Sequence, residues 1–94
     1  MGAKEFATKL GIKSQGKYDQ DNNSFIINLS DSDAYGYAYT KFENSDLLDE
    51  IQESSKVNEN TSNLQFEAID EPFIVGLYAD FDNDIYQITI TRKE

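Results

Sequence analysis

The sequence contains neither cysteine nor histidine, and these absences remove much of the chemistry available to a small protein. Without cysteine the chain has no disulfides, no thiolate nucleophile and no zinc–thiolate site. Without histidine it has no Ser–His or Cys–His nucleophile system. No Gly-rich phosphate-binding loop is present either. We therefore expect a protein that is not an enzyme, with no cofactor and no bound metal.

Apolar residues are few, and they form no long run. No stretch approaches the ~18 consecutive apolar residues of a membrane span, and no signal-peptide core is visible. We therefore expect a cytoplasmic protein that makes no membrane contact. Hydrophobic residues make up 38% of the chain, but six Phe and six Tyr add burial capacity. A length of 94 residues predicts one domain, 1–94, with a modest core.

Positive charge is scarce and unevenly distributed along the chain. Eight Lys and Arg stand against eighteen Asp and Glu, which gives a net charge of −10. Residues 1–17 hold four lysines and one glutamate, whereas residues 18–91 hold two lysines and sixteen acids. A body this acidic repels nucleic acid and anionic membranes and attracts basic partners.

The hydrophobic pattern predicts an α+β domain. Phe6 and Leu10, four residues apart, indicate a helix within 3–13 that ends near Gly11. A second helix is expected to begin at Asn44 or Ser45 and to continue through "DLLDEIQE". Strands are expected over 25–29, 35–42, 64–69, 73–81 and 85–91, with turn-rich segments at 14–24 and 54–63. The short connections favour a five-stranded, mainly antiparallel sheet with two short helices packed on one face, in the order α-β-β-α-β-β-β.

The stretch "AYGYAYTKF" (34–42) places a tyrosine at every second position. Read as a strand, it puts Tyr35, Tyr37 and Tyr39 on one face and small residues on the other. Residues 35–42 partly fit the second consensus of the RNA-recognition motif, but Tyr35 occupies the basic position that would meet phosphate. Two interpretations remain open, a half-covered sheet face and a surface on which tyrosines anchor a partner.

Acidic residues recur at every second position in "DFDND" and "DQDNN". Both stretches begin like a calcium-binding loop, but neither has the glycine and the glutamate that complete one. Turn chemistry is the alternative, since Asp and Asn side chains bond to nearby backbone groups. Rows of carboxylates also imitate a nucleic-acid backbone and fit basic grooves.

These observations favour a small acidic inhibitor that blocks a basic, nucleic-acid-binding surface of a partner protein such as a nuclease. It would act as a nucleic-acid mimic without binding nucleic acid itself, like the anti-defence or immunity-type proteins of phages and mobile elements. The alternative is a non-catalytic structural or accessory domain that self-associates, for example as a homodimer, through a sheet edge or the tyrosine face. The expected partner-binding residues are acids with three tyrosine anchors: Asp80, Asp82, Asp84, Asp46, Asp49, Glu50, Glu53, Tyr35, Tyr37 and Tyr39.

Overall fold

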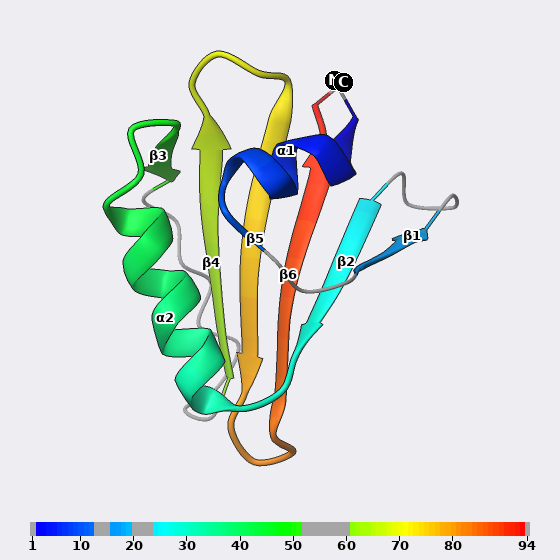
Figure 1. The fold of residues 1–94 in the computed structure, drawn as a ribbon. Coiled ribbons are helices and arrows are strands. Elements are labelled where there is room, and N and C mark those ends of the chain that lie inside the picture. Colours follow the sequence, from blue (N-terminus) through cyan, green and yellow to red (C-terminus); the bar gives the residue numbers. More distant parts are fainter. Residues whose placement is uncertain (1, 13–15, 20–23, 52–60, 94) are drawn as a thin grey trace.

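Six strands form one antiparallel sheet, and two helices cover one of its faces (Figure 1). The computed structural model describes residues 2–12, 16–19, 24–51 and 61–93. The sheet order is β1-β2-β6-β5-β4-β3. In chain order the elements are α1 (Ala3–Lys9), β1 (Gly16–Asp19), β2 (Ser24–Leu29), α2 (Ser32–Glu43), β3 (Leu48–Ile51), β4 (Thr61–Ala68), β5 (Phe73–Asp80) and β6 (Ile85–Arg92). The predicted α+β class, with both helices on one face of an antiparallel sheet, is confirmed.

The β5–β6 hairpin forms the centre of the sheet, as the sequence predicts. Inward-facing Val75 and Leu77 lie opposite Ile90 and Ile88 on the neighbouring strand. All four side chains are fully buried, because these two strands are flanked on both edges by β2 and β4 and covered by the helices. Their burial explains why "FIVGLYADF" is apolar at most positions.

The strand predicted over 35–42 is wrong, since these residues lie in α2. Asp31 caps the helix by accepting a hydrogen bond from the backbone N–H of Ala34 at 2.9 Å. Ala38 and Phe42, four residues apart, turn the same side of the helix toward the sheet and are buried. The helical spacing of Ala38 and Phe42 therefore decides the conformation of a stretch whose tyrosines alternate as they would in a strand.

The helix predicted from Asn44 or Ser45 is also wrong. Asn44 instead ends α2, and Leu48–Ile51 form the edge strand β3, which pairs with residues 65–68 of β4. Residues 14–24, predicted to be turn-rich, contain the opposite edge strand β1. The structure has two short edge strands that were not predicted, β1 and β3, and it lacks the strand predicted over 35–42. The sheet therefore has six strands and not five.

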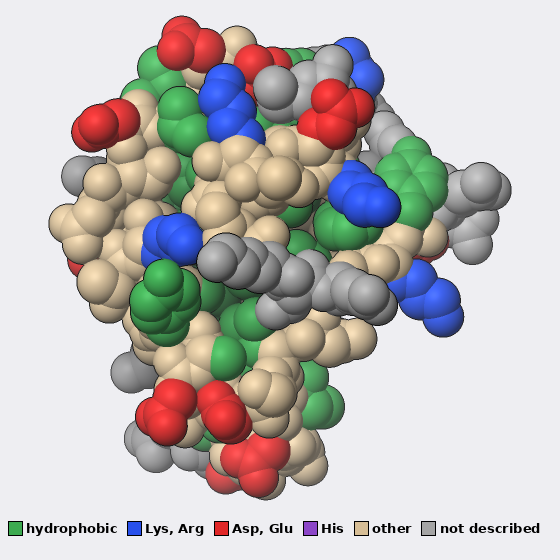
Figure 2. All heavy atoms as spheres, viewed as in Figure 1, with side chains coloured by type: hydrophobic (Ala, Val, Ile, Leu, Met, Phe, Trp, Pro, Cys, Tyr) green, Lys and Arg blue, Asp and Glu red, His purple; other side chains and the backbone are tan. Residues whose placement is uncertain are grey.

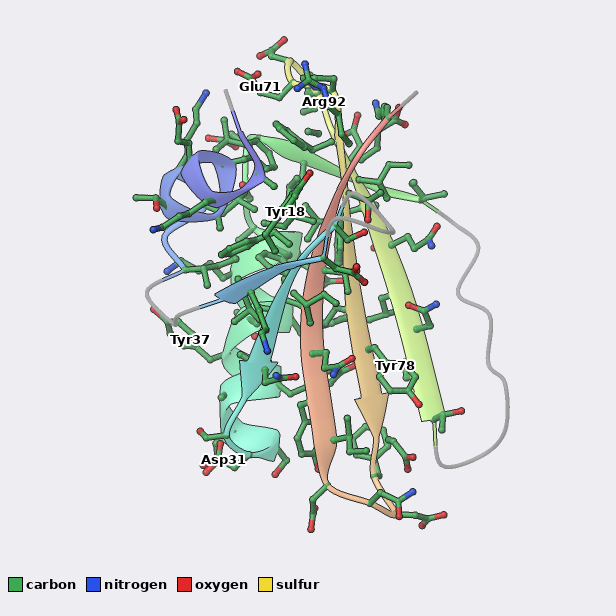
Figure 3. The ribbon with its side chains drawn as sticks, turned by 90° about the vertical axis from the view of Figure 1, so that its right-hand side faces the viewer. Tyr18, Asp31, Tyr37, Glu71, Tyr78 and Arg92 are labelled. Carbon is green, nitrogen blue, oxygen red and sulfur yellow. The ribbon has the colours of Figure 1, made fainter. Side chains whose placement is uncertain are left out.

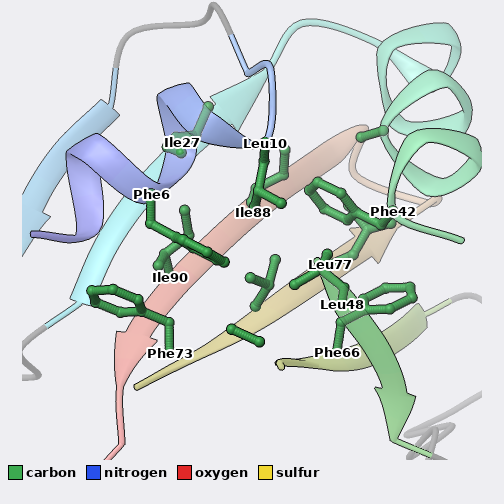
Figure 4. Packing of buried hydrophobic residues seen from close by; sticks show 14 of the residues in the cluster. Phe6, Leu10, Ile27, Phe42, Leu48, Phe66, Phe73, Leu77, Ile88 and Ile90 are labelled. Carbon is green, nitrogen blue, oxygen red and sulfur yellow. The ribbon is translucent and has the colours of Figure 1, made fainter. Parts of the chain in front are cut away.

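The core lies between the helices and the sheet (Figure 4). Phe6 of α1 stacks on Phe73 of β5 with ring centroids 5.1 Å apart. Phe42 of α2 meets Phe66 of β4 edge-on at 5.6 Å. Each helix is thus anchored by one buried phenylalanine pair. In the part of the chain that is described, no helix is long and apolar enough to span a membrane.

The two ends of the molecule are built from different segments. The chain begins and ends near α1 and the β4–β5 turn, whereas the start of α2 and the β5–β6 turn lie at the opposite end (Figure 1). The backbone N–H of Lys93 donates to the carbonyl of Pro72 at 2.7 Å, which links the segment after β6 to the β4–β5 turn. The far end is therefore formed by internal segments.

Candidate functional site

An aromatic cluster joins the start of α2 to the β5–β6 turn. The Tyr35 ring lies 5.9 Å from the Phe81 ring and 5.7 Å from the Tyr86 ring, measured between centroids. Phe81 and Tyr86 are 5.9 Å apart, and all three pairs are tilted or edge-on, as aromatic side chains prefer. Tyr86 is buried, but Phe81 keeps 47% of its surface exposed. The cluster thus fixes the turn and presents one aromatic ring to solvent.

Five aspartates lie in the two chain segments that carry this cluster, and we call the whole surface the acidic end. Two come from the start of α2 and three from the end of β5 and its turn. The acidic end comprises Asp31, Asp33, Asp80, Asp82 and Asp84 together with Tyr35, Phe81 and Tyr86. In the face drawn in Figure 2, red side chains and no blue ones are coloured around this lower end.

Two of these carboxylates have local structural roles. Asp31 caps α2, as described above. One carboxylate oxygen of Asp80 accepts from the backbone N–H groups of Asp82 and Asn83 at 3.2 and 3.3 Å, and the other accepts from the Asn83 side chain at 2.8 Å. The turn chemistry expected from the sequence is therefore present. Asp33, Asp82 and Asp84 are exposed, and their carboxylates accept none of the hydrogen bonds that cap α2 or that Asp80 accepts in the turn.

Asp84 completes the turn and influences Tyr86. Its φ of 53° is in the left-handed region, which Asp tolerates better than most residues. The Tyr86 hydroxyl donates a long hydrogen bond of 3.5 Å to the Asp84 carboxylate. Burial first, and then the Asp84 charge, raise the pKa of Tyr86 above its usual value of 10.0. The negative charge at this end of the molecule thus also affects the buried hydroxyl of Tyr86.

Ion pairs at the opposite end of the molecule involve other carboxylates. Lys9 lies 3.8 Å from Glu71, and Lys93 pairs with Glu67. Basic residues of α1 and of the C-terminal segment are thus placed beside the acids of the β4–β5 hairpin. The acidic end is built from segments of the chain that carry no lysine or arginine, residues 30–35 and 80–86. This separation makes it a coherent source of negative potential.

Four of the ten predicted site residues meet at the acidic end: Tyr35, Asp80, Asp82 and Asp84. Asp46, Asp49 and Glu50 lie in and before β3, beyond the other end of α2. The Tyr39 hydroxyl donates a 2.7 Å hydrogen bond to the Glu43 carboxylate on the same helix. This hydrogen bond raises the pKa of Tyr39 above its usual value of 10.0. Glu53 lies outside the described residues.

Tyr37 points away from Tyr35 and Tyr39, so the predicted three-tyrosine face does not exist. Residues two apart on a helix lie on nearly opposite sides. Tyr37 is 69% exposed, and the Lys41 ammonium lies 5.1 Å from its ring centroid. Both side chains border a mainly apolar hollow of about 280 Å³ between α2 and the end of α1, where Lys41 also donates to the Gly11 carbonyl at 2.9 Å. The hydrogen bond links the two helices.

The partner-binding residues expected from the sequence do not include Asp31, Asp33, Phe81 or Tyr86. Phe81 was expected to end the strand over 73–81, whereas β5 ends at Asp80 and leaves Phe81 in the turn, where it has no strand face to occupy. Among the described residues, no group of three or more acidic side chains is arranged to hold a metal ion. The arrangement suits recognition of a cationic surface, since it combines carboxylates with an exposed aromatic ring.

The chain matches no protein-family model, no curated protein and no solved structure. The fold and the candidate site define it as a small acidic α+β protein with two helices on one face of an antiparallel sheet.

Proposed function

We propose that this protein is a small inhibitor that binds a basic surface of a partner protein and keeps nucleic acid away from it. The single observation that supports this proposal best is the acidic end, where two distant segments that are rich in aspartate meet at the exposed ring of Phe81. Proteins of this type serve phages and mobile elements against host defence systems and nucleases. The absence of histidine and cysteine favours binding over catalysis.

The acidic end would act by occupying cations that otherwise hold phosphate. Exposed carboxylates such as Asp33 and Asp84 would pair with Arg or Lys of the partner. Phe81 would anchor the contact, because aromatic residues supply much of the binding energy at interfaces and also accept the planar guanidinium of arginine on their face. The field of the acidic end would accelerate encounter with a positive surface at low ionic strength.

The test compares two double variants that remove equal charge from opposite ends of the molecule. D33N/D84N changes the acidic end and spares Asp31 and Asp80, which hold the local fold. D46N/D49N removes the same charge near β3 and serves as the matched control. Each protein would be immobilised and used for affinity capture from lysate of the native host, followed by mass spectrometry and by rebinding of the purified partner.

We expect wild type and D46N/D49N to capture a basic nucleic-acid-binding protein that D33N/D84N does not retain. Added DNA or RNA should compete for the same partner, and rising salt should slow association steeply. Equal loss of binding in both variants, or a partner that still binds nucleic acid in the complex, would contradict the proposal.

A further inference from the structure

Among the described residues, the centre of the sheet face turned away from the helices carries no charged side chain. Outward positions on the four central strands follow from the strand register, and Figure 3 shows Tyr78 on this side. They are Ile26 and Asn28 on β2, Gln87, Thr89 and Thr91 on β6, Ile74 and Tyr78 on β5, and Asn63 and Gln65 on β4. Ser24 on β2 and Gly76 on β5 have the same orientation but are already buried. Charged residues make up 28% of the chain, so a surface region without any of them is unusual in this protein.

Charged residues surround this centre on several sides. Glu67 and Lys93 form an ion pair at one end, and Asp80 lies at the other. Lys17 on β1 and Asp49 on β3 occupy outward positions on the two edge strands. An uncharged centre within a charged rim is the anatomy of a protein–protein interface, whose core is depleted of charge.

Polar side chains in the centre already bond to one another. Ser24 and Thr91 share a 2.8 Å hydrogen bond, and Gln87 donates to Asn28 at 2.9 Å. Burial of these groups therefore leaves fewer hydrogen bonds with water to be replaced, which reduces the desolvation penalty. Ile26, Ile74 and Tyr78 supply apolar surface beside them.

The geometry points to a second copy of this chain as the occupant, with this sheet face of one copy packed against the same face of the other around a two-fold axis. Strands ~4.8 Å apart, with alternate residues ~6.7 Å apart, give the uncharged centre an extent of about 20 by 20 Å. That matches the central part of an interface that buries about 800 Å² on each partner. The net charge of −10 makes copies repel one another, so an uncharged face is the most favourable place for them to meet. This surface is separate from the acidic end, and the inference does not depend on the proposed function.

The test is the molar mass in solution, measured by sedimentation equilibrium from about 10 μM to 1 mM. We expect the wild type to approach twice its 10.7 kDa, with a larger dimer fraction at high salt because salt screens the repulsion between acidic copies. T89K places a charge at the centre of the face and should weaken dimerisation at least tenfold. T40K makes the same change on an exposed position of α2, and should leave the dimer intact.

The lysine at position 89 reduces the negative charge of the chain, so general repulsion between copies cannot explain a loss of dimer. Circular dichroism would establish that T89K remains folded, and Q87K offers a second variant on the same face if it does not. A wild-type protein that stays monomeric at 1 mM, at low salt as well as at high salt, would overturn the inference. A dimer that survives T89K and Q87K, or is lost equally in T40K, would overturn it as well.

Discussion

Replacing Gly36 with alanine tests whether residues 32–43 form a helix. Gly36 lies in the middle of α2, and a Cβ built on it has no neighbour within 4 Å. Alanine is favoured over glycine inside a helix by about 0.8–1.0 kcal/mol, because glycine loses more backbone freedom on folding. Since no packing change offsets this gain, we expect G36A to raise the free energy of unfolding by about that amount. For a domain of this size the shift corresponds to roughly 4–8 °C in Tm.

The matched control is the same substitution at Gly11, where the sign should reverse. Gly11 ends α1 with a φ of 85°, and an alanine methyl there would lie 2.6 Å from the Lys41 ammonium nitrogen. The left-handed conformation should lower the free energy of unfolding of G11A by about 1–2 kcal/mol. Both variants would be compared with the wild type by urea denaturation followed by circular dichroism. In a strand, the small residue at position 36 would face a covering helix, so a lower urea midpoint for G36A would refute the helical assignment.

Three further predictions concern the segments that build the acidic end and the core. D31A should lower the free energy of unfolding by about 1 kcal/mol in urea denaturation, because it removes the cap of α2, whereas D31N should retain most of it. F42A should lower it by about 3–5 kcal/mol, since Phe42 is buried against Phe66. The raised pKa of Tyr86 means that the folded state holds its proton more tightly than the unfolded state, so stability from this group is complete below pH 10 and is lost as pH rises further. The difference in urea midpoint between wild type and Y86F should therefore change above pH 10 and stay constant below it; a constant difference throughout would contradict the pKa shift.

The parts of the fold that could be predicted are those with a strong local pattern. Phe6 and Leu10 lie on one side of α1, and Gly11 ends it with the positive φ that glycine favours. The β5–β6 hairpin has apolar strands on both sides of a turn made of Asp and Asn. Neither element needs distant residues to decide its conformation.

Prediction from the local sequence pattern failed where the same residues fitted both the two-residue period of a strand and the period of a helix. Alternating tyrosines at 35–39 satisfied a strand, while Ala38 and Phe42 satisfied a helix, and packing against the sheet decided between them. Asp31 was a local signal for the helix start, because a cap three residues before a helical N–H is typical. The four-residue strand β3 depends on pairing with β4, which no local pattern of "DLLDEI" contains.

The candidate site could be predicted only in part for the same reason. The alternating aspartates Asp80, Asp82 and Asp84 can be recognised in the sequence as one group. Asp31 and Asp33, which share the acidic end with them, lie about fifty residues earlier in the chain. Only the topology brings α2 beside the β5–β6 turn. Conversely, Asp46, Asp49 and Glu50 resemble the other acids in sequence, and the fold places them elsewhere.

The placement of the chain ends has a practical consequence for the experiments above. Because α1 begins and β6 ends on the side of the molecule remote from the start of α2 and the β5–β6 turn (Figure 1), an affinity handle fused to either terminus would project away from the surface under test. Protein immobilised on beads through this handle would then expose the acidic end to the solution in a uniform orientation. Failure to retain a ligand on such beads would reflect the chemistry of the surface rather than obstruction by the support.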